Sequence, residues 1–177
     1  MQGTLALAMT LCFAWVMLSA GAGKLAAAND YRVLVARYLD AASVSSAVVM
    51  LIGAVEVMLG LALLLPVSRA MATSLVALLM LGYAMAMARL WMQGVRDMRC
   101  GCGGPASDTR IGPALMLRNI LAALLLLLCT VASEGNALAV ALALGLLLVC
   151  FWYALDGLIA NGQKMQVMKR HLNSGAN

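Results

Sequence analysis

Charged residues are scarce in this chain, and their scarcity rules out an ordinary soluble domain. They make up 11% of the 177 residues, and seven of them are acidic. A soluble domain needs far more polar surface to cover its core, whereas 64% of this sequence is hydrophobic. The net charge of +5 does not indicate a nucleic-acid partner, because the basic residues stand between apolar stretches rather than on a polar face. The composition therefore predicts an integral membrane protein in contact with the lipid bilayer.

Cysteine and histidine are too few and too scattered for a disulfide scaffold or a structural zinc site. There are five cysteines, an odd number, and two of them lie close together. A single histidine, His171, and the lack of a second close cysteine pair exclude a closed four-ligand zinc site, so no metal site is predicted. Cys12, Cys129 and Cys150 lie inside apolar stretches, where a cysteine is most simply a small core residue.

Five apolar stretches are long enough to cross a bilayer as helices, which takes about 20 residues each. They cover residues 3–23, 46–65, 70–91, 112–133 and 137–159. The first has no basic segment ahead of it, so we expect a retained helix rather than a cleaved signal peptide. The sequence thus predicts an all-α membrane protein, a bundle of about five transmembrane helices that form one integral membrane domain over 1–177.

Lysine and arginine are distributed unevenly around these spans. Eleven of the twelve fall on one side of the five-span arrangement, and Arg69 falls on the other. Because basic residues gather in cytoplasmic loops, this distribution predicts an outer N-terminus, an inner C-terminus and a cytoplasmic third connection, residues 92–111. Residues 30–39 carry apolar and aromatic side chains at helical spacing, which indicates a short helix in the membrane interface.

The third connection contains two cysteines, in the sequence Cys100-Gly101-Cys102, followed by two glycines and a proline. Glycine lets the backbone bend enough to bring the two sulfurs together. A disulfide across one residue is expected to be strained, and strained, exposed disulfides exchange readily. The reactive thiolate is favoured by three nearby arginines, Arg96, Arg99 and Arg110. The pair is therefore a candidate redox site; capture of a soft metal and an incidental pair in a flexible loop are the alternatives.

Glu56 lies ten residues into the second span, where an ionisable side chain is costly and usually faces a partner inside the bundle. Arg118 in the fourth span is the expected partner, because the two differ in depth by about 7 Å at 1.5 Å per residue. The simplest interpretation is a buried ion pair between helices, and a role in proton or quinone chemistry is the alternative. Asn119 is expected to hydrogen-bond between helices, and Asp156 to lie at the interface.

Four short motifs, in order, resemble those of the methylamine utilisation protein E (MauE) family, within the wider DoxX-like set. Residues 19–25 resemble the ending "aGl.KL" of the family's first helix, and residues 56–61 resemble its second-helix motif "E…lGl". Residues 100–104 resemble the CGCFG signature, and residues 117–119 the "l.RN" motif that follows it. Gly103 stands where the family usually has Phe, so an aromatic contact near the thiols is lost here.

This resemblance covers most of residues 14–128 and implies both a fold and a role. The implied fold is a four-helix DoxX-like core plus a C-terminal helix, in the bacterial inner (cytoplasmic) membrane. The implied role is assistance in disulfide formation during maturation of methylamine dehydrogenase, a periplasmic enzyme with a disulfide-rich small subunit, together with a thioredoxin-like partner. The resemblance implies that Cys100 and Cys102 form a redox-active disulfide. It implies a supporting role for Glu56, Arg118 and Asn119.

A cytoplasmic thiol pair and a periplasmic client, an amine dehydrogenase or another disulfide-rich protein, require electrons to cross the membrane. Cys12 and Cys129 both lie toward the outer half and form a candidate second thiol pair, while a quinone in the bundle is a candidate cofactor. Two other classes of function stay open. One is a soft-metal carrier for copper or mercury that uses the same two thiolates, and the other is a non-catalytic membrane scaffold subunit.

Overall fold

The computed structural model describes residues 2–96, 98–101, 109–131 and 138–174. The described part is helical apart from its connections and one isolated antiparallel bridge between Arg99 and Arg110, which confirms the predicted all-α bundle. Six helices follow one another along the chain: α1 (Gln2–Ala26), α2 (Ala28–Leu39), α3 (Ser46–Leu64), α4 (Arg69–Met92), α5 (Pro113–Val131) and α6 (Leu138–Ser174).

Five of these helices correspond to the five predicted spans. By length and composition, α1, α3, α4 and α6 are apolar enough to cross a membrane, and α5 has a shorter apolar stretch, Pro113–Leu128. The main difference is at the end of the chain, where α6 continues 15 residues past the predicted end at 159. Residues 160–174 contain no proline and several good helix formers, so nothing in them ends the helix where the apolar character stops. The chain is a multi-pass membrane bundle.

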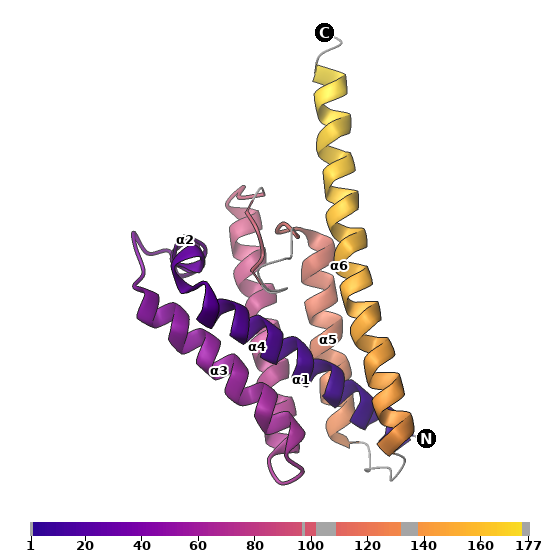
Figure 1. Cartoon of the computed structure of the whole chain (residues 1–177). Coiled ribbons are helices and arrows are strands. Elements are labelled where there is room, and N and C mark those ends of the chain that lie inside the picture. The colour runs from indigo at the N-terminus through magenta and orange to yellow at the C-terminus, as the bar shows by residue number, and fades with distance from the viewer. Residues whose placement is uncertain (1, 97, 102–108, 132–137, 175–177) are drawn as a thin grey trace.

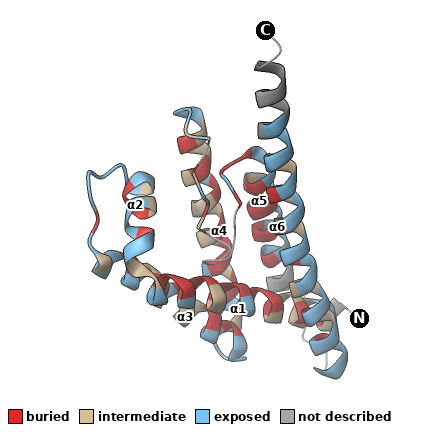
Figure 2. Ribbon diagram, turned by 45° about the horizontal axis from the view of Figure 1, so that its top comes forward, coloured by how far each residue is buried: buried red, intermediate tan, exposed pale blue. Residues whose placement is uncertain are grey.

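Helix α1 lies at the centre of the bundle. It packs along α3 and α6 and also contacts α2 and α5, while α4 packs along α5 (Figure 1). Its side chains are the most buried of the candidate spans, as the red stretch in Figure 2 shows, and those of α6 are the least buried. The large apolar side chains that stay exposed on α3, α5 and α6 lie on surfaces that would contact lipid in a membrane.

The basic residues gather at one end of this bundle. Helix α2, the connection between α4 and α5, and the C-terminal part of α6 lie toward the same end, whereas the N-terminus and the turn between α3 and α4, with Arg69, lie toward the other (Figure 1). The bundle therefore has the up-and-down arrangement on which the charge count depends. The side of the membrane that each end faces stays a prediction.

Two glycines let α1 and α3 approach closely. A Cβ added to Gly21 would lie 2.6 Å from the carbonyl oxygen of Gly53, and one added to Gly53 would lie 2.9 Å from the carbonyl oxygen of Gly21. Small residues at a contact between membrane helices allow such backbone approach. This contact determines how near Lys24, one turn further along α1, comes to α3.

Candidate functional site

Cys100 is held between the two arms of the third connection. Its backbone N–H donates to the carbonyl of Thr109 at 2.9 Å, and the N–H of Ile111 donates to the carbonyl of Met98 at 2.9 Å. The Tyr38 hydroxyl, from α2, donates to the Cys100 carbonyl at 3.1 Å. Residues before and after the cysteine pair are therefore joined to each other and to α2.

The Cys100 side chain is buried, which differs from the exposed thiol expected from the sequence. It is 2% exposed and lies in an apolar cluster with Met87, Leu90, Ile111 and Leu115. Its Sγ donates to Met87 Sδ at 3.6 Å. The expectation of exposure was wrong for this residue because the connection folds back into the bundle and α2 covers it. Cys102 lies outside the described residues.

Gly101 occupies a position that requires glycine. Its φ of +73° is a backbone conformation that other residues rarely adopt. A Cβ there would collide with Cδ2 of Leu34 and come within 3.3 Å of Tyr31 Cε1, both on α2. The glycine between the two cysteines thus does more than loosen the loop, because it lets the loop pack directly against the interfacial helix.

Lys24, Glu56 and Tyr83 form a buried polar cluster between α1, α3 and α4. Lys24 Nζ donates to both carboxylate oxygens of Glu56, at 2.8 and 2.7 Å, and the side chains are 5% and 1% exposed. The Tyr83 hydroxyl donates to Glu56 Oε1 in a short hydrogen bond. Lys24 Nζ also lies 5.8 Å from the centre of the Tyr83 ring and 5.9 Å from that of Tyr31.

The predicted pairing of Glu56 with Arg118 is therefore wrong. Glu56 is buried and paired, as expected, but its cationic partner comes from α1. Lys24 was assigned to a loop because the predicted span ended at 23, whereas α1 continues to Ala26 and keeps Lys24 inside the helix. The signal was present in the sequence, since the segment of the family resemblance, residues 19–25, contains Lys24.

Tyr83 connects this ion pair with the thiol. Its ring packs against the apolar cluster that contains Cys100 and Met87, while its hydroxyl is bonded to Glu56. Tyr31 lies near Lys24 on one side and near Gly101 on the other. Tyr83 thus contacts both the buried ion pair and the cluster that contains the thiol, while Tyr31 lies between the ion pair and Gly101.

Arg118 forms a second buried cluster with α6. Its Nη1 donates to Asp156 Oδ1, and Asn119 Oδ1 accepts from Arg118 Nε and Nη2 at 3.4 and 3.2 Å. The guanidinium lies over the Trp152 ring, 4.1 Å from its centre. Asp156 is 6% exposed, so the expected place at the interface was wrong: α6 runs far beyond it and holds it against α5. Asn119 was expected to hydrogen-bond between helices, but its partner among the described residues is Arg118, its neighbour on α5.

Two polar atoms of this second cluster have no hydrogen-bond partner among the described residues. They are Asn119 Nδ2 and Asp156 Oδ2, and both are buried. Such orphaned groups are few in native proteins, and each normally has an explanation in an unseen partner.

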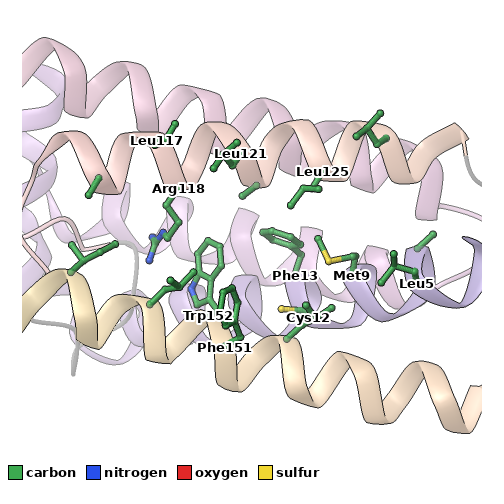
Figure 3. Close-up of a pocket in the computed structure, with 17 residues that line it drawn as sticks. Leu5, Met9, Cys12, Phe13, Leu117, Arg118, Leu121, Leu125, Phe151 and Trp152 are labelled. Atoms are coloured by element: carbon green, nitrogen blue, oxygen red, sulfur yellow. The ribbon is translucent and has the colours of Figure 1, made fainter.

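Beside this cluster, a cavity of about 830 Å³ lies between α1, α5 and α6. Arg118 and Trp152 lie toward one end of it and Leu5 toward the other, with Cys12 and Phe13 between them (Figure 3). Cys12 is buried and unpaired. The Cys129 side chain lies outside the described residues, so the second thiol pair stays a prediction.

No group of three or more His, Cys, Asp or Glu side chains within the described ranges is placed to hold a metal ion. The described residues bring together a thiol, two buried ion pairs and an apolar cavity.

Comparison with known proteins agrees with the order of the sequence motifs. The family model described as "Methylamine utilisation protein MauE" matches residues 2–132 of the 177. This match includes α1 to α5. It contains both members of the Lys24–Glu56 pair, and Arg118 but not Asp156 of the second pair. No curated protein and no solved structure gives a significant match.

Proposed function

The chain belongs to the methylamine utilisation protein MauE family, and from this membership we propose that it is a membrane thiol–disulfide redox protein. In this proposal it assists disulfide formation in, and maturation of, a periplasmic enzyme such as an amine dehydrogenase, from the bacterial inner membrane. The observation that carries the proposal is the burial of the Cys100 thiol in an apolar cluster against which Tyr83 packs. The Tyr83 hydroxyl in turn donates a hydrogen bond to Glu56, which is paired with Lys24.

The proposed reaction is exchange between a Cys100–Cys102 disulfide and the dithiol of a thioredoxin-like partner. A partner thiolate attacks one sulfur, the disulfide bond breaks, and a mixed disulfide forms. The partner's second thiolate then attacks the partner sulfur of the mixed disulfide and displaces the cysteine of this chain as a thiolate. The partner leaves as a disulfide, and Cys100 and Cys102 become thiols by taking up the two protons that the partner's thiols lose. The oxidised partner is then able to oxidise the client.

In this proposal the buried polar cluster of Lys24, Glu56 and Tyr83 provides a proton-holding group near the reacting sulfur. A cysteine leaves as a thiolate and must gain a proton, and burial in an apolar cluster makes the uncompensated anion costly. Tyr83 packs against that cluster and is bonded to Glu56, which Lys24 neutralises. The three side chains form a neutral, hydrogen-bonded unit able to hold or pass a proton near the thiol, in a supporting role.

Alkylation trapping of membranes tests this proposal. We expect two interconverting forms of the wild-type protein, with and without reductant, and one form in Cys100→Ser. Cys150→Ser is the matched control, because Cys150 is an exposed, unpaired cysteine on α6 and its loss should leave both forms in place. Cysteines that always alkylate fully, or never do so, would contradict the redox cycle.

A second candidate function has one specific observation in its favour. Cys100 Sγ and Met87 Sδ lie 3.6 Å apart, and thiolate and thioether sulfurs are the ligands that Cu(I) prefers. We infer from this pair a soft-metal carrier as the competing function. Met87→Leu separates the two, because it should leave disulfide cycling unchanged and abolish stoichiometric Cu(I) binding if the carrier function holds.

A further inference from the structure

We propose that the cavity between α1, α5 and α6 binds a membrane quinone. This inference rests on the proposed redox function, for which the quinone would be the electron acceptor. The cavity has a volume of about 830 Å³, within the range of roughly 300–1,000 Å³ that is usual for small-molecule sites. Its lining is apolar except at the end where Arg118 and Trp152 lie (Figure 3).

The polar end of the cavity favours an uncharged head group. Arg118 is already neutralised by Asp156, so an anionic ligand would meet a buried carboxylate as well as the guanidinium. Asn119 and Asp156, which bond the guanidinium, do not line the cavity themselves, so Arg118 is the charged group that a ligand meets there. A quinone ring suits this end of the cavity, because it is uncharged and its carbonyls accept hydrogen bonds from a donor such as the Arg118 guanidinium.

The apolar part of the cavity suits a ring and an isoprenoid tail. Trp152 and Phe13, whose rings meet edge to face with centres 5.6 Å apart, contribute aromatic surface to its wall. Leu117, Leu121 and Leu125 line it and remain about half exposed, so the cavity is open at the surface that the lipid covers. A ligand dissolved in the bilayer therefore reaches it without crossing water.

A phospholipid fits the cavity less well than a quinone does, both with its acyl chain and with its phosphate head group. An acyl chain alone brings no hydrogen-bonding group to the end of the cavity where Arg118 lies. A phosphate head group would have to be carried about 7–8 Å along α5 from its start at Pro113 to reach Arg118, at 1.5 Å per residue, and lose its water there. An uncharged quinone ring avoids both costs.

The cavity and the thiol cluster share a wall. Ile159 lines the cavity and also packs against the cluster that contains Cys100, and Ala114 of the lining adjoins Leu115 of that cluster. The proposed step balances: the Cys100 and Cys102 thiols lose two electrons and two protons as their disulfide forms. The quinone gains the same two electrons and two protons and becomes the hydroquinone.

Photolabelling tests the site, with a 3-azido analogue of ubiquinone and the full-length protein in phosphatidylcholine nanodiscs. We expect saturable labelling that decylubiquinone displaces. Leu121→Trp, which fills the cavity from a lipid-facing position, should reduce labelling at least tenfold. Leu124→Trp is the matched control, because Leu124 is equally exposed on α5 but does not line the cavity, and labelling should be unchanged.

Three outcomes would overturn the inference. Labelling that rises without saturation and equally in both variants would mean that the cavity holds acyl chains only. Loss of labelling when phosphatidylglycerol replaces phosphatidylcholine would assign the site to an anionic lipid. Saturable labelling with no reduction of decylubiquinone by the fully reduced protein would refute the acceptor role.

The failure of this inference can be distinguished from failure of the proposed function. Suppose that alkylation trapping shows disulfide cycling but the azidoquinone does not label the protein. The quinone site would then be refuted, and the redox function would stand. Cys100→Ser should bind the azidoquinone as wild type does and fail to reduce decylubiquinone, since it changes the electron donor and no residue of the cavity.

Discussion

At the scale of single residues, four charged side chains are buried in the part of the chain that the structure describes, and each of them is paired. Lys24 bonds Glu56, and Arg118 bonds Asp156, in both cases between helices that are far apart in the sequence. Burying an ion pair is costly, and its net contribution to stability is often small. Removing one partner is different, because it leaves a charge buried in the bundle without compensation.

Glu56→Ala should therefore destabilise the protein by about 3–5 kcal/mol, and Lys24→Ala by a similar amount. The double variant should lose less than the sum of the two single losses, because the partners are in direct contact. Thermal unfolding in detergent measures all three. The exposed pair Arg89–Asp40 is the matched control, 48% and 71% exposed, and its loss should cost at most about 1 kcal/mol. Additive losses for Lys24 and Glu56 would show that the pair does not form.

The glycine between the cysteines gives a second prediction at this scale. Gly101→Ala should lose disulfide cycling, because its backbone is in the left-handed region and its Cβ would strike Leu34. Gly94→Ala is the control, since Gly94 has a φ of +82° but no neighbour within 4 Å of a Cβ, so it carries the backbone strain alone. Strain of this kind costs about 1–3 kcal/mol.

Adding Leu34→Ala to Gly101→Ala should restore part of the cycling in the alkylation assay, because it removes the methyl group that the new Cβ meets. If Gly101→Ala and Gly94→Ala behave alike, and Leu34→Ala rescues nothing, packing of α2 on the loop does not matter for the redox site.

At the scale of helices, the contact between α1 and α3 decides which ionisable residues meet. The spans themselves could be predicted from hydropathy, because each apolar stretch has the length that a bilayer requires. The partner of Glu56 could not be predicted in this way, since the backbone approach at Gly21 and Gly53 brings α1, and with it Lys24, against α3. Asp156 was misplaced for a related reason, because the extension of α6 past residue 159 is not marked by apolar character.

Gly53→Ala tests this contact. The added methyl would lie 2.9 Å from the Gly21 carbonyl oxygen, so the helices must move apart and weaken the Lys24–Glu56 pair. Gly82→Ala on α4 is the control, with open space around its Cβ, and it should stabilise by about 0.5–1 kcal/mol because alanine favours a helix more than glycine does. Thermal unfolding should show a clear loss for the first variant only. Equal behaviour of the two variants would show that close approach at Gly53 does not matter.

At the scale of the whole molecule, the buried groups form a path across the bundle. The thiol cluster adjoins the Lys24–Glu56 pair through Tyr83, and it adjoins the cavity beside Arg118 through Ile159. The apolar cavity could not be predicted from the sequence, because it depends on how α6 leans on α1 and leaves space beside α5. Motif order was enough to predict the family, whereas the burial of Cys100 depends on how the third connection folds back into the bundle.

The last prediction concerns the side of the membrane that the cysteine loop faces, because it decides how electrons travel. Eleven of the twelve basic residues fall on one side of the predicted spans, and nine of these lie outside the buried pairs that Lys24 and Arg118 form. Placing these nine outside would be costly during insertion, so we expect the loop in the cytoplasm. A cytoplasmic loop meets a reducing thiol pool and suits a relay that carries electrons outward, which is the reverse of the electron flow proposed above. A periplasmic loop suits direct exchange with a thioredoxin-like partner.

Labelling of intact cells with a membrane-impermeant maleimide separates these cases, in a variant that keeps Cys102 as its single cysteine. We expect labelling only after the membrane is broken. The control is Val67→Cys in a cysteine-free background, because Val67 is fully exposed in the turn at the opposite end of the bundle and should label in sealed cells. Rapid labelling of Cys102 in sealed, reductant-treated cells, with Val67→Cys protected, would reverse the topology and refute the outward relay. The redox pair would stand, with its partner in the periplasm.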